Sequence, residues 1–134
     1  NRLFVIAGPP INNEVLTTDN IKFPLNLIYL GYISDEEMAF FMKYCQAFLF
    51  PSLYEGFGIP PLEALYFGAR VLCSNSTCLP EIYKDYVTYF DPYDYDVDLD
   101  KLLEKPVNKS KEIFDLYSWD KSAKQLLNII KQYQ

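Results

Sequence analysis

The stretch Pro51–Glu63 reads PSLYEGFGIPPLE and indicates the fold class. The run that leads into it, Ala47–Pro51 (AFLFP), is short, apolar and ended by a proline, which is typical of a buried parallel strand. The Pro60–Pro61 pair presets helical backbone angles where N–H groups have no partner, and Gly68 suits a left-handed helix end. The stretch therefore predicts a strand, a loop and a helix from about Pro60 to Phe67.

Two carboxylates stand in this stretch with seven residues between them, Glu55 in the glycine-flanked loop and Glu63 on the helix. The N-terminus of a helix at the carboxyl edge of a parallel sheet favours anionic ligands such as phosphates. Gly56 and Gly58 let a ligand approach the backbone closely. Since prolines cannot donate, any amides must come from Gly58, Ile59, Leu62 and Glu63. The pattern favours a binding site, and the alternative is a glycine-rich turn with two solvated glutamates.

Short apolar runs alternate with helical patterns along the chain. The expected strands are Leu3–Ala7, Leu27–Gly31, Ala47–Pro51, Arg70–Ser74 and Val87–Phe90. The expected helices lie within Asn12–Asn20, from the capping box of Ser34 and Glu37 to about Gln46, at Pro60–Phe67, at Leu79–Lys84, near Asp98–Glu104, and after Ser118, with Trp119 packed on its own domain. This order predicts an α/β fold, a doubly wound parallel sheet of about five strands with right-handed crossovers.

Composition indicates one compact domain spanning residues 1–134. Half of the residues are hydrophobic and 17% are aromatic, enough for a substantial core. The formal charge of −6, with scattered basic residues that are mostly lysine, argues against nucleic acid as a partner. Three cysteines in or beside apolar segments are expected to be reduced thiols in a cytoplasm. The chain has no histidine, which excludes every Ser-His, Cys-His or His-metal scheme that it could supply alone.

An acidic series recurs at every second residue: Asp94, Asp96, Asp98 and Asp100. A calcium loop counted from Asp94 would need glycine where Leu99 stands and glutamate where Lys105 stands. Because neither Leu99 nor Lys105 fits a calcium loop, we expect no metal. We interpret the series as an acidic, solvated loop that caps the following helix.

Glu55–Ala64 (EGFGIPPLEA) resembles the Glu, seven residues, Glu signature of retaining glycosyltransferases of the GT-B architecture, the large group 1 family. Further segments match that family in the same order, namely Gly31–Glu37, Leu79–Ile82, Phe90–Pro92 and Ser118–Trp119. The resemblance covers nearly the whole chain. It implies the C-terminal, nucleotide-sugar-binding half of a GT-B fold, a Rossmann-like domain.

The resemblance also implies that the chain is a piece of a longer two-domain enzyme and is inactive alone. The family's first strand and helix, which carry an Arg and Lys pair for the diphosphate, would precede Asn1, as would the acceptor domain. The implied partners are a nucleotide sugar and that N-terminal acceptor domain, and any peripheral membrane contact would be made through the preceding half. No cofactor or metal is implied. The only arginines in this chain are Arg2 and Arg70.

Individual roles follow from the resemblance. Glu63 would accept hydrogen bonds from both ribose hydroxyls, a task suited to a carboxylate because it only accepts. Glu55, the catalytic candidate, would contact the donor sugar near the developing positive charge. The backbone amides offered to that sugar would be those of Gly56, Phe57 and Gly58. The nucleotide site would include Ile59 and Leu62, with the base bracketed by Gly31, Tyr32 and Ile33.

The nucleotide stays open between GDP and UDP. Asp35 could accept from guanine but not comparably from uracil, or it could be an ordinary acidic residue favoured in the first turn of a helix. The leading hypothesis is a retaining, metal-independent hexosyltransferase. The alternative is a catalytically silent Rossmann-like module for binding or assembly. A nicotinamide oxidoreductase is excluded because no G-x-G-x-x-G opens a first strand and helix.

Overall fold

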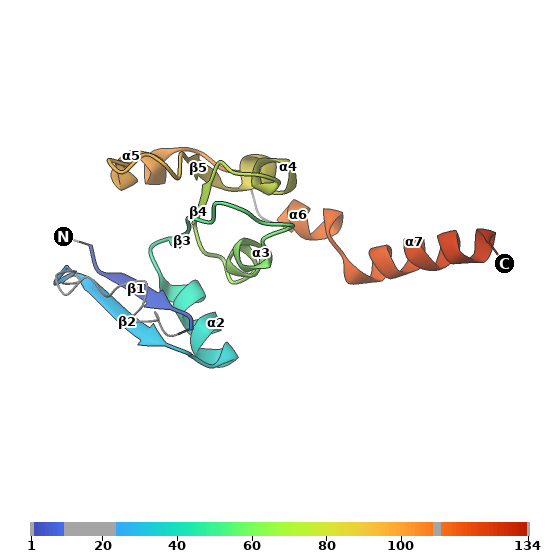
Figure 1. Ribbon diagram of the computed structural model, residues 1–134, viewed down its shortest axis with the longest axis horizontal. Coiled ribbons are helices and arrows are strands. Elements are labelled where there is room, and N and C mark those ends of the chain that lie inside the picture. The colour runs from blue at the N-terminus through green and yellow to red at the C-terminus, as the bar shows by residue number, and fades with distance from the viewer. Residues whose placement is uncertain (1, 10–23, 109–110, 134) are drawn as a thin grey trace. The chain divides into compact units, whose positions relative to one another are not determined.

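The structure, a computed structural model, describes residues 2–9, 24–108 and 111–133 (Figure 1). The chain divides into two compact units, residues 1–40 and residues 41–134, which are described separately below. The helix expected within Asn12–Asn20 lies outside the described residues. Within the described residues, no helix combines the length and the apolar character needed to cross a bilayer.

The first unit is built on two parallel strands. β1 (Phe4–Ala7) pairs with β2 (Leu27–Gly31). α2 (Asp35–Tyr44) follows β2 and runs past the unit boundary. The expected capping box is confirmed, because the Ser34 N–H donates to Glu37 Oε2 at 2.8 Å and the Glu37 N–H donates to Ser34 Oγ at 3.2 Å.

The second unit contains a three-stranded parallel sheet in the order β3 (Phe48–Phe50), β4 (Val71–Ser74), β5 (Thr88–Phe90). Its helices are α3 (Ile59–Tyr66), α4 (Leu79–Tyr83), α5 (Leu99–Glu104), α6 (Lys111–Leu116) and α7 (Trp119–Gln132), with a 3-10 turn at Lys84–Tyr86. The α/β fold with parallel strands is confirmed. The described strands form two sheets, one in each unit, where the sequence predicted one.

The core of the second unit is centred on β4, whose four residues are all buried because the strand has a neighbour on each side. The buried side chains around it include Ala64, Leu65, Leu79, Ile82 and Tyr83. Cys73, in this strand, is fully buried, and burial raises the pKa of its thiol to about 12. The thiol is therefore protonated at neutral pH.

Arg70 ties the start of β4 to β5 and α5. Its Nη2 donates to Thr88 Oγ1 at 2.7 Å, to the Leu102 carbonyl at 3.3 Å and to the Lys105 carbonyl. These partners hold the guanidinium through Nη2 at the amino end of β4, whereas ligands of parallel sheets bind at the carboxyl end. Arg70 thus has a structural role. It does not supply the arginine that a phosphate site would need.

Replacing Arg70 with methionine is expected to lower the free energy of unfolding by about 2 kcal/mol, because three acceptors lose a charged donor. Urea unfolding followed by circular dichroism measures this loss. Lys105→Met is the matched control, since it removes a cation but keeps the carbonyl that Arg70 contacts, and it is expected to change stability by less than about 0.5 kcal/mol. Equal losses in both variants would contradict the structural role.

The C-terminal helices depart from the prediction. α6 was not predicted, and none of the residues of α7 is buried. The expectation that Trp119 packs on its own domain is wrong, because its side chain is 86% exposed. α7 is amphipathic, but in the described part of the chain its apolar face has no packing partner. A periodic pattern specifies the face of a helix and not the surface that covers it.

Candidate functional site

Three loops of the second unit leave the sheet at one edge. In the parallel register Phe50 pairs with Cys73, and Ser74 pairs with Phe90, so the strands end side by side. The segments that follow are residues 51–58 after β3, 75–78 after β4 and 91–98 after β5. The carboxyl edge of a parallel sheet is where open α/β folds bind ligands. The predicted loop that carries Glu55 is therefore at the expected edge.

The Glu55 side chain is held in place but not buried. Ser52 Oγ donates to Glu55 Oε1 at 2.8 Å, and the structure describes no hydrogen-bond partner for Oε2. Ser52 is fixed in turn, because the fully buried Ser74 donates from its hydroxyl to the Ser52 carbonyl. One carboxylate oxygen is thus anchored while the other is available as an acceptor.

The backbone of Glu55 is held by the loop after β4. The Glu55 N–H donates to Thr77 Oγ1 at 3.3 Å, and the Thr77 hydroxyl lies 3.4 Å from the Glu55 carbonyl oxygen. The Cys78 thiol donates to the same carbonyl at 3.2 Å. These contacts fix the peptide groups on both sides of the Glu55 Cα.

Gly58 begins α3 in a left-handed conformation, with φ 75° and ψ 65°. It is buried, and its carbonyl accepts from the Tyr83 hydroxyl. The Phe57 ring packs edge-on against Tyr117, with centroids 5.2 Å apart, and against Tyr83. Gly56 is exposed. The side chain of Phe57 therefore anchors the loop to the protein, which leaves the backbone around Gly56 accessible.

α3 presents the second predicted acid to solvent. Glu63 is exposed, Ile59 is 49% exposed and Leu62 is half-buried. No ion pair of Glu63 occurs among the described residues. The N-cap of α3 is Gly58, which has no side chain to accept from the first turn, so the free N–H groups of that turn need other partners. Glu55 and Glu63 thus lie in one unit, on a loop and on the helix that this loop begins.

The residues predicted to bracket a base lie in the first unit. Gly31 ends β2 with φ 70°, and its carbonyl accepts from the Gly8 N–H at 2.9 Å. Tyr32 is 81% exposed and Ile33 is half-buried. Asp35 is exposed in the first turn of α2. These residues follow the carboxyl end of a strand, as expected, and their role toward a base stays a prediction.

The acidic series forms a loop that hydrogen-bonds to its own backbone. Asp91 Oδ1 accepts from the Tyr93 N–H and Asp94 Oδ1 accepts from the Asp96 N–H, each at 2.9 Å. Asp98 caps α5, as predicted: Oδ1 accepts from the Lys101 N–H at 3.1 Å, and Oδ2 pairs with Lys101 Nζ at 3.1 Å. These contacts lower the pKa of the Asp98 carboxyl, the backbone hydrogen bond most of all.

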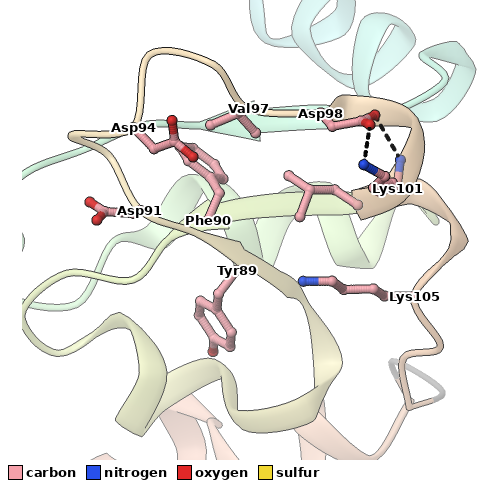
Figure 2. Close-up of a pocket in the computed structure, with 9 residues that line it drawn as sticks. Tyr89, Phe90, Asp91, Asp94, Val97, Asp98, Lys101 and Lys105 are labelled. Carbon is pink, nitrogen blue, oxygen red and sulfur yellow. Dashed lines mark hydrogen bonds and ion pairs between the residues drawn. The ribbon is translucent and has the colours of Figure 1, made fainter.

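A pocket of about 360 Å³ lies beside this loop (Figure 2). It is lined by Tyr89, Phe90, Asp91, Asp94, Val97, Asp98, Lys101, Leu102 and Lys105. Neither Glu55 nor Glu63 lines it, and its acids serve the local turns described above, so we do not take it as the site. No group of three or more side chains suited to a metal occurs in the part of the chain that the structure describes. The expectation of a metal-independent protein stays a prediction.

Sequence reasoning missed the residues that support the Glu55 loop. They are Ser52, Ser74, Thr77, Cys78 and Tyr83. One signal was present: Ser74–Cys78 is a run of small polar residues that directly follows a predicted buried strand, and hence lies at the edge where ligands bind.

Parallel strands, with Glu55 on the loop after β3 and Glu63 on α3, are the features of a Rossmann-like domain of the GT-B type. The family described as "Glycosyl transferases group 1" matches residues 1–115. This chain belongs to the group 1 glycosyltransferases, as the sequence signature predicted.

Particular relatives and one solved structure agree with this assignment. The chain is 37% identical over 112 residues to O-antigen chain mannosyltransferase B of Escherichia coli, covering 77% of this chain and 29% of that protein. It is 43% identical over 79 residues to the serotype-specific mannosyltransferase WbdA of Escherichia coli, covering 59% of this chain and 10% of that protein. The fold resembles that of AviGT4, a glycosyltransferase involved in avilamycin A biosynthesis, with a TM-score of 0.72 at 18% identity, covering 98% of this chain and 44% of that one. The chain thus spans less than a third of the length of either curated relative.

Proposed function

We propose that this chain is the donor-binding part of a retaining, metal-independent hexosyltransferase. The observation that carries the proposal is the environment of the Glu55 carboxylate. Ser52 anchors one oxygen at the carboxyl edge of the sheet, and the other oxygen has no hydrogen-bond partner among the described residues. Glu63, exposed on the helix that follows, supplies a second acceptor-only group. Two such acids suit a ligand rich in hydroxyl groups, which is the chemistry of a glycosyl nucleotide.

In this proposal Glu63 accepts from the two ribose hydroxyls and Glu55 from the hydroxyls of the sugar. Gly56, which is exposed, offers a backbone amide beside Glu55, and Phe57 and Gly58 follow it. Ile59 and Leu62 lie on the same helix as Glu63 and line the approach to the nucleotide. The acids bind through hydrogen bonds to hydroxyl groups, so neither requires a cation.

The reaction breaks the bond between the sugar C1 and the leaving phosphate oxygen, and forms a bond from C1 to an acceptor oxygen on the same face. The acceptor proton passes to the departing phosphate, which leaves as the nucleoside diphosphate. Positive charge develops on the sugar ring as the first bond lengthens. In this proposal the Glu55 carboxylate stabilises that charge and does not attack C1. Ser52 already holds the side chain in place before the charge forms, so little reorganisation is needed.

Mannose is the sugar that we propose first, supported by the names of the two mannosyltransferases to which this chain is similar. GDP and UDP are both candidate nucleotides. Asp35 is exposed in the first turn of α2, a position that suits either a contact with guanine or the helix dipole alone. A titration with GDP-mannose, UDP-glucose, GDP and UDP separates the two nucleotides.

Replacing Glu63 with glutamine is expected to weaken binding of the preferred nucleotide sugar by between about 10-fold and 100-fold. The variant keeps the shape of the side chain but loses the charge that strengthens two hydrogen bonds to the ribose. Isothermal titration calorimetry on the wild-type and variant forms of the proposed two-domain protein measures the change in Kd. The same substitution is expected to lower affinity for the free nucleotide equally, because the ribose is common to both ligands.

Glu104→Gln, an exposed change on α5, is the matched control and is expected to leave Kd unchanged. If no nucleotide sugar binds the wild-type protein, or if Glu63→Gln binds as tightly as the wild type, the proposed function fails. A binding or assembly module without turnover would then be the better description.

A further inference from the structure

The backbone conformation of Thr77 is unusual. Its φ is 47°, in the left-handed region, where a β-branched side chain is strained. Thr77 is exposed, so burial of its side chain does not offset this strain. Strained residues of this kind persist where the surrounding structure holds them, and they cluster at functional sites.

Among the described contacts, the Thr77 hydroxyl meets one residue, Glu55. It accepts from the Glu55 N–H at 3.3 Å and lies 3.4 Å from the Glu55 carbonyl oxygen, where it can donate. These two groups flank the Glu55 Cα, so one hydroxyl restrains both adjoining peptide groups. The two residues are 22 positions apart and belong to loops that leave the neighbouring strands β3 and β4.

The other contacts to Glu55 complete its restraint. Ser52 holds carboxylate Oε1 at 2.8 Å, and the Cys78 thiol donates to the backbone carbonyl at 3.2 Å. Ser52, which is tied to β4 through the Ser74 hydroxyl, restrains the end of the Glu55 side chain but not the backbone of Glu55. The contact from Thr77 connects that loop to the segment after β4, the buried strand at the centre of the sheet.

We propose that Thr77 is a positioning residue for Glu55. Its hydroxyl sets the backbone of the Glu55 loop, so that the free Oε2 oxygen is presented to the donor sugar in a fixed direction. The proposal rests on the proposed function and adds to it a residue outside the signature that defines the family resemblance. Because the strain at Thr77 opposes stability, the residue contributes to orientation of the acid rather than to the folded state.

The experiment compares three substitutions, Thr77→Val, Thr77→Ser and Thr77→Gly. Turnover is followed in the proposed two-domain enzyme as nucleoside diphosphate released from GDP-mannose or UDP-glucose, whichever binds, with water as the acceptor. Thr77→Val is expected to lower kcat about tenfold, since misplacement of a reacting group costs rate, and to change KM for the donor less than threefold. Thr77→Ser restores the hydroxyl and is expected to recover kcat to within about threefold of the wild type.

Thr77→Gly separates orientation from stability. Glycine relieves the strain, so the Tm is expected to stay within about 2 °C of the wild type or to rise, while kcat falls at least as far as in Thr77→Val. Thr88→Val is the matched control, because Thr88 is 3% exposed and its hydroxyl contacts only Arg70 among the described contacts. That control is expected to lower the Tm and to leave kcat unchanged.

The positioning role is overturned if Thr77→Gly keeps kcat within twofold of the wild type, or if Thr77→Ser is as slow as Thr77→Val. A different result would contradict the proposed function: a Glu63→Gln variant that binds the donor as tightly as the wild type. If Glu63→Gln weakens binding while Thr77→Gly turns over normally, the donor site stands and only the role of Thr77 is wrong.

Discussion

Replacing Glu55 with glutamine is expected to lower kcat of the proposed transferase by about 100-fold to 1000-fold, the scale seen when one fixed group that stabilises transition-state charge is removed. The Glu55 carboxylate carries a negative charge shared by its two oxygens, and glutamine replaces this group with a neutral amide. The loss falls on kcat more than on donor affinity, because positive charge on the sugar exists only in the transition state. Initial rates at saturating donor, together with Kd from calorimetry, separate the two effects.

This variant is expected to fold normally. The glutamine side-chain oxygen can still accept from Ser52 Oγ, which lies 2.8 Å from the carboxylate in the wild type, and the backbone contacts of residue 55 are unchanged. Ser52→Ala is a useful companion, since it keeps the charge but frees its orientation, and it is expected to cost less than Glu55→Gln. A Glu55→Gln enzyme whose kcat stays within threefold of the wild type would rule out the catalytic role.

Gly58→Ala is expected to destabilise the fold by about 2–5 kcal/mol, which is a large part of the stability of a typical domain. Gly58 has φ 75°, and a Cβ at this position would lie 2.8 Å from Leu79 Cδ2 and 3.4 Å from Phe50 Cε1. Leu79 is fully buried, so it cannot move away without disturbing the core. The cost combines backbone strain with overpacking, and urea unfolding followed by circular dichroism measures it.

The neighbouring Gly56 provides the control. A Cβ there meets nothing within 4 Å, and its φ is outside the left-handed region. Gly56→Ala is therefore expected to change the free energy of unfolding by less than about 0.5 kcal/mol. Similar stabilities for the two alanine variants would show that the described backbone around Gly58 is wrong.

Most of the regular structure could be predicted from local sequence. Leu27–Gly31 is found with the predicted bounds, and the predicted helix Pro60–Phe67 is found at Ile59–Tyr66. Gly68 adopts φ 86° after α3, as expected for a residue that ends a helix. These features succeed because prolines, glycines and short apolar runs act through the local backbone.

The support of the candidate site could not be predicted in the same way. The contact of Thr77 with Glu55 joins residues 22 positions apart, and it depends on β3 and β4 being neighbours. The left-handed conformation of Thr77 is set by that tertiary contact against the local preference of threonine. For α7 the pattern identified an apolar face, but no local signal says which surface covers it.

We propose that the loop and helix carrying Glu55 and Glu63 bind a glycosyl nucleotide. A crystal structure of the protein grown with the nucleotide sugar that binds in the titration is the decisive test. We expect both ribose hydroxyls within hydrogen-bonding distance of the Glu63 carboxylate, and a sugar hydroxyl within hydrogen-bonding distance of Glu55 Oε2. A nucleotide bound elsewhere, such as in the pocket beside Asp91 and Lys105, with both glutamates free of the ligand, would contradict it.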